Sequence, residues 1–362
     1  MRIAFFGSSL VSAYWNGAAT YYRGLIRALS ARGHEVAFFE PDALGRQQHR
    51  DMDDPDWARV VVYPAEEGAV LRALEEARSF DLIVKASGVG VFDDLLEAGV
   101  AEMRRPGSIV AFWDVDAPAT LDRVENDQAD PLRALIPRFD VVFTYGGGRP
   151  VMRAYEALGA RACVPVYNAL DVSTHHPVPP EPRFAADLAF IGNRLPDREA
   201  RVEEFFLKPA SLLPARRFLL GGSGWEGRSL PASVRAFGHV YTSDHNAINC
   251  SVRAVLNVNR ASMARYGFSP PTRIFEAAGA GACVISDAWQ GIELFLEPGR
   301  EVLLAGNGED VARRLDGLDP GRARAIGRAA RRRMLAHHTY EHRIAEVKAA
   351  LEGRDGALRR AG

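Results

Sequence analysis

Short apolar runs alternate with amphipathic helical stretches along almost the whole chain. The runs occupy residues 3–6, 36–39, 82–85, 109–112, 141–144 and 163–166 in the first half, and residues 188–191, 218–220, 255–258, 283–286 and 302–304 in the second. Buried parallel strands take this form because helices cover both faces of their sheet. The pattern predicts an α/β protein with two doubly wound parallel sheets.

A proline-rich stretch, HPVPPEP at residues 176–182, separates the two sets of runs. Such a stretch cannot be a central strand or a helix interior, and it is typical of a semi-rigid linker. We therefore expect a first Rossmann-like domain at residues 1–172, a second at 183–345, and a C-terminal helix or tail at 346–362 that can cross back. Ligands bind outside the carboxyl ends of strands in open α/β sheets, so functional residues are expected just after strands.

Composition narrows the classes of partner. The chain has 362 residues, 47% of them apolar and 25% charged, and a formal net charge of −1, which gives no bulk attraction to nucleic acid. No run reaches the roughly 18 apolar residues of a membrane span, so we expect a cytoplasmic protein, with peripheral membrane association left open. Cys163, Cys250 and Cys283 lie far apart and predict buried reduced thiols.

The most informative segment follows the strand predicted at 255–258. Ser269 is placed to cap a helix, and Thr272 and Arg273 fall in its first turn. Such a helix start offers free N–H groups and a positive dipole end to an anion. Glu276, one turn further, can accept hydrogen bonds from paired ribose hydroxyls. The segment predicts a nucleoside diphosphate site, with an ordinary capped helix carrying an exposed Arg–Glu pair as the alternative.

Several spaced motifs surround this segment: RIFEAAGAGA at 273–282, SD at 286–287, GIELF at 291–295, EPGREV at 297–302 and HTYEHR at 338–343. With them the chain resembles the CgeB-like, or spore-maturation-type, glycosyltransferases, which are similar to the group-1 glycosyltransferases of GT-B fold. The resemblance covers residues 187–343, and in the first half it rests on WDVDAP at 113–118. It implies GT-B architecture, with two Rossmann-like domains facing across a cleft and the donor bound by the second.

The resemblance also implies donor contacts. In the wider family two acids, with seven residues between them, mark the sugar and the ribose; Glu276 matches the second, whereas Phe268 stands in place of the first. The remaining candidates are Gly192, Asn193, Arg194 and Arg198 at the diphosphate, Gly222 for close backbone approach, His239, Val240 and Tyr241 at the nucleobase, and Asn16 and Gly17 in the first domain. The alternative for Arg194 and Arg198 is a turn with solvated side chains, and the alternative for Gly222 is a flexible turn.

Two carboxylates, Asp114 and Asp116, follow the run at 109–112. At the end of a strand they are candidates for a general base or an acceptor contact. The alternative is that one caps the next helix and the other is solvated. His338 and His342 stand four apart on a predicted helix, but no third ligand is identifiable, so no metal site is expected. The basic run at 328–333 is typical of a solvated helix face, with a docking patch for an anionic acceptor as the alternative.

Together these features predict a glycosyltransferase that moves a sugar from a nucleoside-diphosphate sugar to an acceptor without metal or cofactor. Arginines and a helix N-terminus would stabilise the charge that grows on the departing diphosphate. The resemblance implies retention of configuration. We take UDP as the expected nucleotide, although no residue identifies the base, the sugar or the acceptor. A nucleotide-sugar epimerase of the same fold and a non-catalytic nucleotide-sugar-binding protein, suggested by Phe268, are the alternatives.

Overall fold

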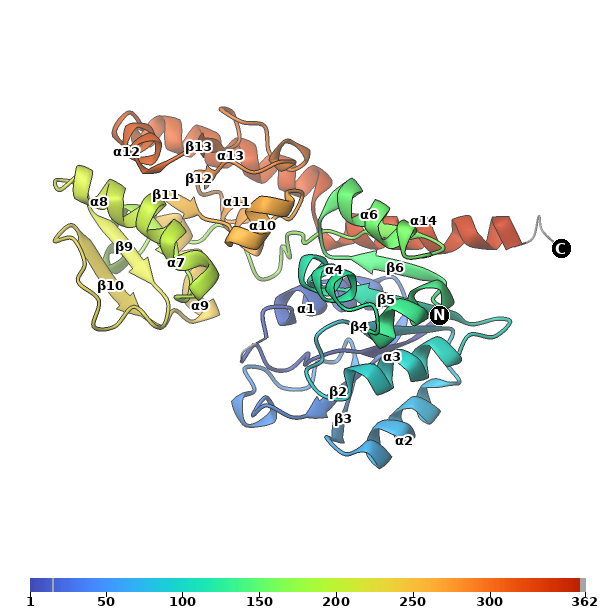
Figure 1. Ribbon diagram of the computed structural model, residues 1–362. Helices are drawn as coiled ribbons and strands as arrows, with labels where there is room; N and C mark the ends of the chain where they lie inside the picture. The colour runs from blue at the N-terminus through green and yellow to red at the C-terminus, as the bar shows by residue number, and fades with distance from the viewer. Residues whose placement is uncertain (15, 359–362) are drawn as a thin grey trace. The chain divides into compact units, whose positions relative to one another are not determined.

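The computed structural model describes residues 1–14 and 16–358, and for residues 353–358 the backbone alone; residues 359–362, the end of the predicted tail, lie outside this part. The chain divides into two compact units (Figure 1). The first unit comprises Met1–Tyr167 with Tyr340–Gly362, and the second unit comprises Asn168–Thr339. Each unit is built on one parallel sheet.

The first unit holds a sheet of seven parallel strands in the order β3-β2-β1-β4-β5-β6-β7. Apolar side chains of β1 and β4 are almost fully buried, which explains the unbroken apolar runs in the sequence. The strands are β1 (Arg2–Phe6), β2 (Glu35–Asp42), β3 (Arg59–Pro64), β4 (Leu82–Ala86), β5 (Ile109–Asp114), β6 (Val141–Thr144) and β7 (Cys163–Pro165), and the helices are α1 (Ala19–Ala31), α2 (Glu67–Ala77), α3 (Asp93–Glu102), α4 (Ala117–Asn126), α5 (Pro131–Leu135), α6 (Gly148–Ala157) and α14 (Tyr340–Leu358).

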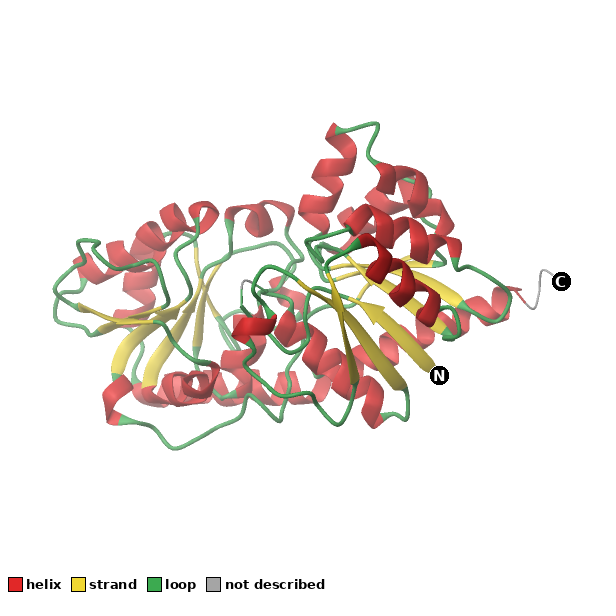
Figure 2. Ribbon diagram, turned by 90° about the horizontal axis from the view of Figure 1, so that it is seen from below, coloured by secondary structure: helices red, strands yellow, loops and turns green. Residues whose placement is uncertain are grey.

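The second unit holds six parallel strands in the order β10-β9-β8-β11-β12-β13. Taken by itself, each unit has helices on both sides of its strands (Figure 2). The strands are β8 (Ala186–Ile191), β9 (Phe218–Gly221), β10 (Val234–Gly238), β11 (Val252–Asn257), β12 (Val284–Asp287) and β13 (Leu303–Ala305), and the helices are α7 (Pro196–Val202), α8 (Lys208–Leu212), α9 (Thr242–Ser251), α10 (Ala261–Tyr266), α11 (Thr272–Gly279), α12 (Gly308–Asp316) and α13 (Pro320–His337).

All eleven predicted runs coincide with strands, and the two doubly wound parallel sheets are confirmed. Two strands were not predicted, β3 and β10, and both lie at the edge of a sheet. Edge strands have one unpaired side and less burial, so β10 contains only half-buried and exposed residues and does not form an apolar run. β3 does carry three consecutive valines, and only their partial exposure sets it apart from the central strands.

The unit boundaries differ from the predicted domain limits. The first unit ends at Tyr167, and the proline-rich stretch lies inside the second unit, where Val178 N donates to Cys250 Sγ and Glu181 N donates to Ser251 Oγ on α9. The C-terminal segment rejoins the first unit from Tyr340, six residues before the predicted start of the tail at 346, and α14 packs on α1. The Tyr340 ring packs over Gly24 of α1, and a side chain at position 24 would collide with that ring.

The strand orders fix where each sheet can bind a ligand. The order reverses between β1 and β4 in the first unit and between β8 and β11 in the second. Loops that leave the carboxyl ends of neighbouring strands part at such a point and open a crevice. Every helix among the described residues is too short or too polar to span a lipid bilayer.

Candidate functional site

The segment before α11 has a different local structure from the predicted one. The helix begins at Thr272 after Pro271, and the Ser269 hydroxyl donates to Gly267 O at 3.0 Å, so the prediction that Ser269 caps the helix is wrong. Pro271 disfavours a helical conformation for the preceding Pro270, so the helix cannot begin there. Phe268 adopts a left-handed φ of 46°, and its ring covers Gly291, where a Cβ would lie 2.4 Å from the ring.

Two guanidinium groups meet at the carboxyl end of β8. Arg273 Nη2 donates to Ile191 O at 3.1 Å, and Arg198 Nη2 donates to Asn193 O at 2.5 Å. Burial and the neighbouring charge of Arg273 lower the pKa of Arg198 to about 10. Arg198 therefore has a backbone carbonyl as its hydrogen-bond partner and a like charge as its neighbour, which is the environment of an anion site.

Glu276 lies inside the same unit with most of its surface covered. Its residue is 8% exposed, and its Oε2 is 3.3 Å from Arg273 Nη1. Burial alone would raise the pKa of Glu276, but the charge of Arg273 and two nearby histidines hold it below its ordinary value. The carboxylate is thus kept ionised, as a ribose acceptor must be.

The two histidines, His175 and His245, are functional candidates that the sequence did not reveal. One precedes the second sheet and the other lies on α9, and together with Glu276 they place one ligand-type atom each within 4.8 Å of one another. Burial lowers the pKa of His175, and burial with the charge of Arg273 lowers that of His245 to about 4. Their separations of 70 and 31 residues along the chain match no local motif, so only the fold brings them together.

The loop after β8 is packed tightly against the loop after β9. Asn193 Oδ1 accepts from Ser223 N at 3.0 Å, and Trp225 Nε1 donates to Gly192 O at 2.8 Å. Gly222 has a φ of 126°, and a Cβ there would lie 2.3 Å from Gly192 O. Glycine is therefore required at position 222 because the two loops approach each other closely there.

Arg194 lies in the same loop but points to a different partner. Its Nη2 donates to Glu199 Oε1 at 2.7 Å, and its side chain is 40% exposed. Glu199 also binds Arg228, so Arg194 belongs to a surface ion-pair network. Its predicted role at the diphosphate stays a prediction.

The predicted nucleobase segment follows β10. Val240 packs over Gly221, where a Cβ would lie 2.5 Å from its side chain. His239 and Tyr241 are exposed and stack edge to face with ring centroids 4.6 Å apart. An exposed aromatic pair at the carboxyl end of a strand is a surface on which a planar base can pack, and the base contact stays a prediction.

Asp114, at the end of β5, is fully buried. Its carboxylate accepts hydrogen bonds from Ser87 Oγ at 2.7 Å, from Thr120 Oγ1 at 2.9 Å and from the Tyr155 hydroxyl, and it also accepts from the backbone N–H of Asp116. Burial raises the pKa of Asp114, although the hydrogen bonds oppose the shift. A carboxylate with these partners and no exposed surface reaches a substrate only if its network opens.

The two other first-unit candidates also serve the loop that carries them. Asn16 is 7% exposed; its Oδ1 accepts from Ser8 Oγ at 2.8 Å, and its Nδ2 donates to Ser9 O and Ser12 O. Gly17 is exposed, and a Cβ there would meet open space. Asn16 therefore holds the loop between β1 and α1 in shape.

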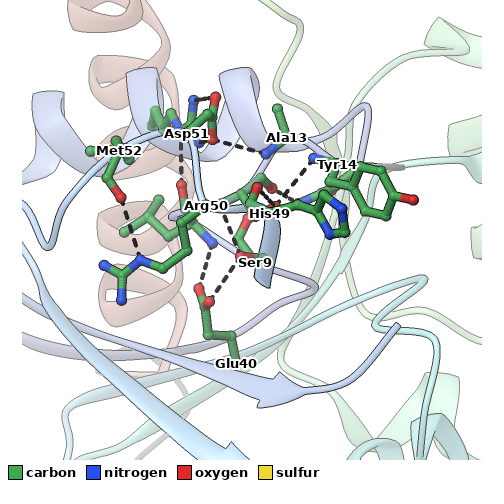
Figure 3. A network of polar contacts seen from close by, with 12 residues as sticks. Ser9, Ala13, Tyr14, Glu40, His49, Arg50, Asp51 and Met52 are labelled. Carbon is green, nitrogen blue, oxygen red and sulfur yellow. Dashed lines mark hydrogen bonds and ion pairs between the residues drawn. The ribbon is translucent and has the colours of Figure 1, made fainter. Parts of the chain in front are cut away.

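Charged side chains complete the same loop (Figure 3). Glu40 on β2 accepts from Ser9 Oγ at 2.8 Å, and Asp51 accepts from Ala13 N at 3.1 Å. Figure 3 shows Glu40 below the loop and Asp51 beyond it, so the segment is tied down from two sides. The polar groups at this edge of the first sheet are largely occupied by the protein itself.

His338 packs in an aromatic cluster with Phe275 and Phe295. It belongs to no group of three metal-ligating side chains among the described residues, where the one such group is the His175, His245 and Glu276 cluster.

Comparison with known proteins gives this geometry a context. Residues 198–349, which include both arginines and Glu276, match the family model described as glycosyl transferase-like. This part of the chain is therefore similar to a glycosyltransferase domain. The sequence matches no curated protein at a significant level.

Solved structures of glycosyltransferases resemble the whole chain. HepE from Anabaena, solved with UDP and glucose, has 16% identity and a TM-score of 0.65, and the match covers 97% of this chain and 100% of HepE. A sucrose-phosphate synthase from Thermosynechococcus elongatus has 16% identity and a TM-score of 0.67 over 100% of both chains. An α-glucosyltransferase solved with UDP and a 13-mer DNA containing an HMU base has 13% identity and a TM-score of 0.70, covering 97% and 99%. These likenesses confirm the predicted GT-B fold.

Proposed function

We propose that this protein transfers a sugar from a UDP-sugar to an acceptor. The observation that carries the proposal is the pair of guanidiniums, Arg198 and Arg273, which bind carbonyls two residues apart at the strand-order reversal of the second sheet. A diphosphate would add the negative charge that balances two neighbouring guanidiniums, only one of which has Glu276 as an ion-pair partner. The bound UDP in HepE and in the α-glucosyltransferase supports uridine as the base.

The chemistry needs stabilisation of the leaving diphosphate. Two fixed guanidiniums and the N-terminus of α11 are oriented before the reaction, so they stabilise the growing charge without reorganisation. Arg273 can serve both ends of the nucleotide because it also contacts Glu276, the proposed ribose acceptor. We propose on this basis that transfer needs no metal ion.

Acceptor contacts and stereochemistry belong to the same proposal. Since Asp114 is occupied by its hydrogen-bond network, Asp116 is the carboxylate that we assign to the acceptor side. The motif resemblance to CgeB-like enzymes supports that subgroup and retention of configuration. The three free cysteines, Cys163, Cys250 and Cys283, support a reducing, cytoplasmic location.

One observation favours a second candidate, a nucleotide-sugar-binding protein without turnover. Phe268 stands eight positions before Glu276, and its ring is fixed over Gly291 by a left-handed backbone. Phe268 offers no carboxylate to a sugar at this position. The two candidates share donor binding and differ in whether sugar is released or transferred.

Thermal stability and product analysis test the proposal. UDP and UDP-sugars should raise the melting temperature of the wild type in the presence of chelator, because a ligand that binds the native state stabilises it. Arg273→Ala should weaken UDP binding about tenfold to a hundredfold, the loss expected for charge-assisted hydrogen bonds.

Three results have distinct meanings in this experiment. Transfer or release of sugar with free UDP supports the transferase. Donor binding without any product supports the second candidate, and an isomerised sugar without acceptor would show an epimerase. If no nucleotide changes the melting temperature of the wild type, the donor site is wrong.

A further inference from the structure

A compact group of metal-ligating side chains lies beside the proposed ribose contact. His175 precedes the second sheet, His245 lies on α9 and Glu276 lies on α11, and one ligand atom from each falls within 4.8 Å of the others. His175 Nε2 and Glu276 Oε1 are 4.0 Å apart. In the part of the chain that the structure describes, no other three side chains of this kind meet.

Two imidazole nitrogens of this group have no partner in the protein. His175 Nε2 and His245 Nδ1 are buried and have no hydrogen-bond partner among the described residues, and His175 itself is only 3% exposed. Glu276 Oε2 makes no hydrogen bond either, but it lies 3.3 Å from Arg273 Nη1 in an ion pair. Buried polar atoms are almost always hydrogen-bonded, so two imidazole nitrogens left without partners beside a carboxylate indicate a ligand.

The tautomer of His175 follows from its neighbour. Thr174 Oγ1 donates its one hydrogen to Asp171 O at 3.3 Å, and it also lies 2.9 Å from His175 Nδ1. With the hydroxyl hydrogen on Asp171 O, the hydroxyl accepts from His175 Nδ1, and in this tautomer Nε2 carries the lone pair that a metal ion needs. The hydroxyl then orients the ring as outer partners of metal-bound histidines do.

We propose that His175, His245 and Glu276 form a binding site for Zn²⁺ or a similar transition-metal ion. Two imidazoles and one carboxylate are a ligand set that zinc uses with an open fourth position. In a tetrahedral site with bonds of about 2.1 Å, ligand atoms lie about 3.4 Å apart. The two imidazoles can rotate toward this spacing, because no hydrogen bond holds His175 Nε2 or His245 Nδ1 in place.

The site has a regulatory consequence that rests on the proposed function. A metal ion on Glu276 takes the carboxylate that the ribose would use, so the ion and the nucleotide exclude each other. Arg273, at 3.3 Å from Glu276, opposes a cation and favours a diphosphate. Zinc therefore inhibits donor binding, and a saturating donor displaces zinc.

Cobalt spectroscopy tests the site without any activity. Co²⁺ titrated into the chelator-treated full chain should produce the visible absorption bands of a protein-bound ion, saturating at a 1:1 ratio and lost on addition of Zn²⁺. His175→Ala and His245→Ala should weaken Co²⁺ binding by at least about tenfold. His337→Ala, which removes an exposed histidine elsewhere in the same unit, should leave the bands unchanged.

Arg273→Ala separates the metal site from the nucleotide site. This change should strengthen Co²⁺ binding, because a positive charge is removed, and it should weaken UDP binding. Excess UDP should bleach the bands of the wild type. Circular dichroism and melting temperatures establish whether each variant is folded. If His175→Ala is not folded, Glu276→Gln provides a nearly isosteric change of a ligand in its place.

The results separate the two proposals. Absent bands in the wild type, or bands that persist in folded His245→Ala and Glu276→Gln, overturn the metal site. Co²⁺ bands that UDP leaves intact, although UDP binds, overturn the competition. If UDP does not bind the metal-free protein but the Co²⁺ bands appear, the metal site stands and the proposed function fails.

Discussion

Both units carry polar candidates near the carboxyl ends of their strands, but the hydrogen bonding of these candidates differs. In the first unit, Asp114 and Asn16 have their polar atoms taken by neighbouring groups of the same unit. In the second unit, Arg198 Nε is buried without a hydrogen-bond partner among the described residues. Arg273 Nη1 and Glu276 Oε2 make no hydrogen bond either and have each other as ion-pair partners at 3.3 Å.

The difference in hydrogen bonding distinguishes polar groups that stabilise the fold from polar groups that can bind a ligand. A buried group with all its hydrogen bonds made stabilises the loop that contains it. A buried group left without partners costs free energy in the empty protein, and a ligand recovers that cost. The comparison therefore assigns Asp114 to stability and the second-unit group to binding, and each assignment can be broken separately.

The largest effect is expected for Asp114→Ala. The change leaves Ser87, Thr120 and the Tyr155 hydroxyl without their acceptor inside the first unit. We expect the free energy of unfolding to fall by about 3–5 kcal/mol, as when one partner of a buried polar network is removed. Urea unfolding followed by circular dichroism measures it.

Asp122→Ala is the matched control, because Asp122 is an exposed carboxylate on the neighbouring helix α4. It should change the free energy of unfolding by no more than about 0.5 kcal/mol. A catalytic Asp114 would give a different result, namely a variant with wild-type stability and no turnover. That outcome would reverse the comparison.

The next effect separates two arginines of one loop. Arg198 is held beside Arg273 with a carbonyl partner, whereas Arg194 is tied to Glu199 at the surface. Arg198→Ala should weaken UDP binding at least about tenfold, since a charge-assisted hydrogen bond is lost. Arg194→Ala should change UDP affinity by no more than about twofold. Calorimetric titration with UDP compares them, and equal losses would return Arg194 to the diphosphate site.

Most of the fold could be predicted because burial leaves a record in the sequence. Central strands such as β1 and β8 are buried on both faces and appear as apolar runs. The edge strand β10 lacks that record, and the crossing at Tyr340 depends on the fit of its ring over Gly24, which no local pattern encodes.

The site was less predictable for a related reason. Arg273 and Glu276 lie on one helix, so their spacing in the sequence was enough to predict them as a pair. His175 and His245 come from distant segments and meet only in the folded unit. Conversely, Asp114 and Asn16 had the expected position, but their hydrogen bonds decided their role: Asn16 binds its own loop, and Asp114 binds Ser87 and Tyr155, which lie far along the chain.

The smallest effect concerns the acid sensitivity of the second unit. His245 has a pKa of about 4 in the folded protein, against an ordinary value of 6.5, because burial and Arg273 disfavour its charged form. Below pH 6.5 the unfolded chain takes up a proton at this residue and the folded chain does not, so stability falls as the pH falls, until about pH 4. His245→Gln removes this contribution. Since the ring is partly exposed, the loss of stability between these limits should be smaller in the variant by roughly 1–2 kcal/mol.

Urea unfolding of both proteins with chelator across this pH range measures the difference, and the contribution of His175, which is present in both proteins, cancels. Parallel pH profiles would mean that His245 is solvated, and the contrast between an occupied first unit and an unsatisfied second unit would then rest on the arginines and Glu276 alone.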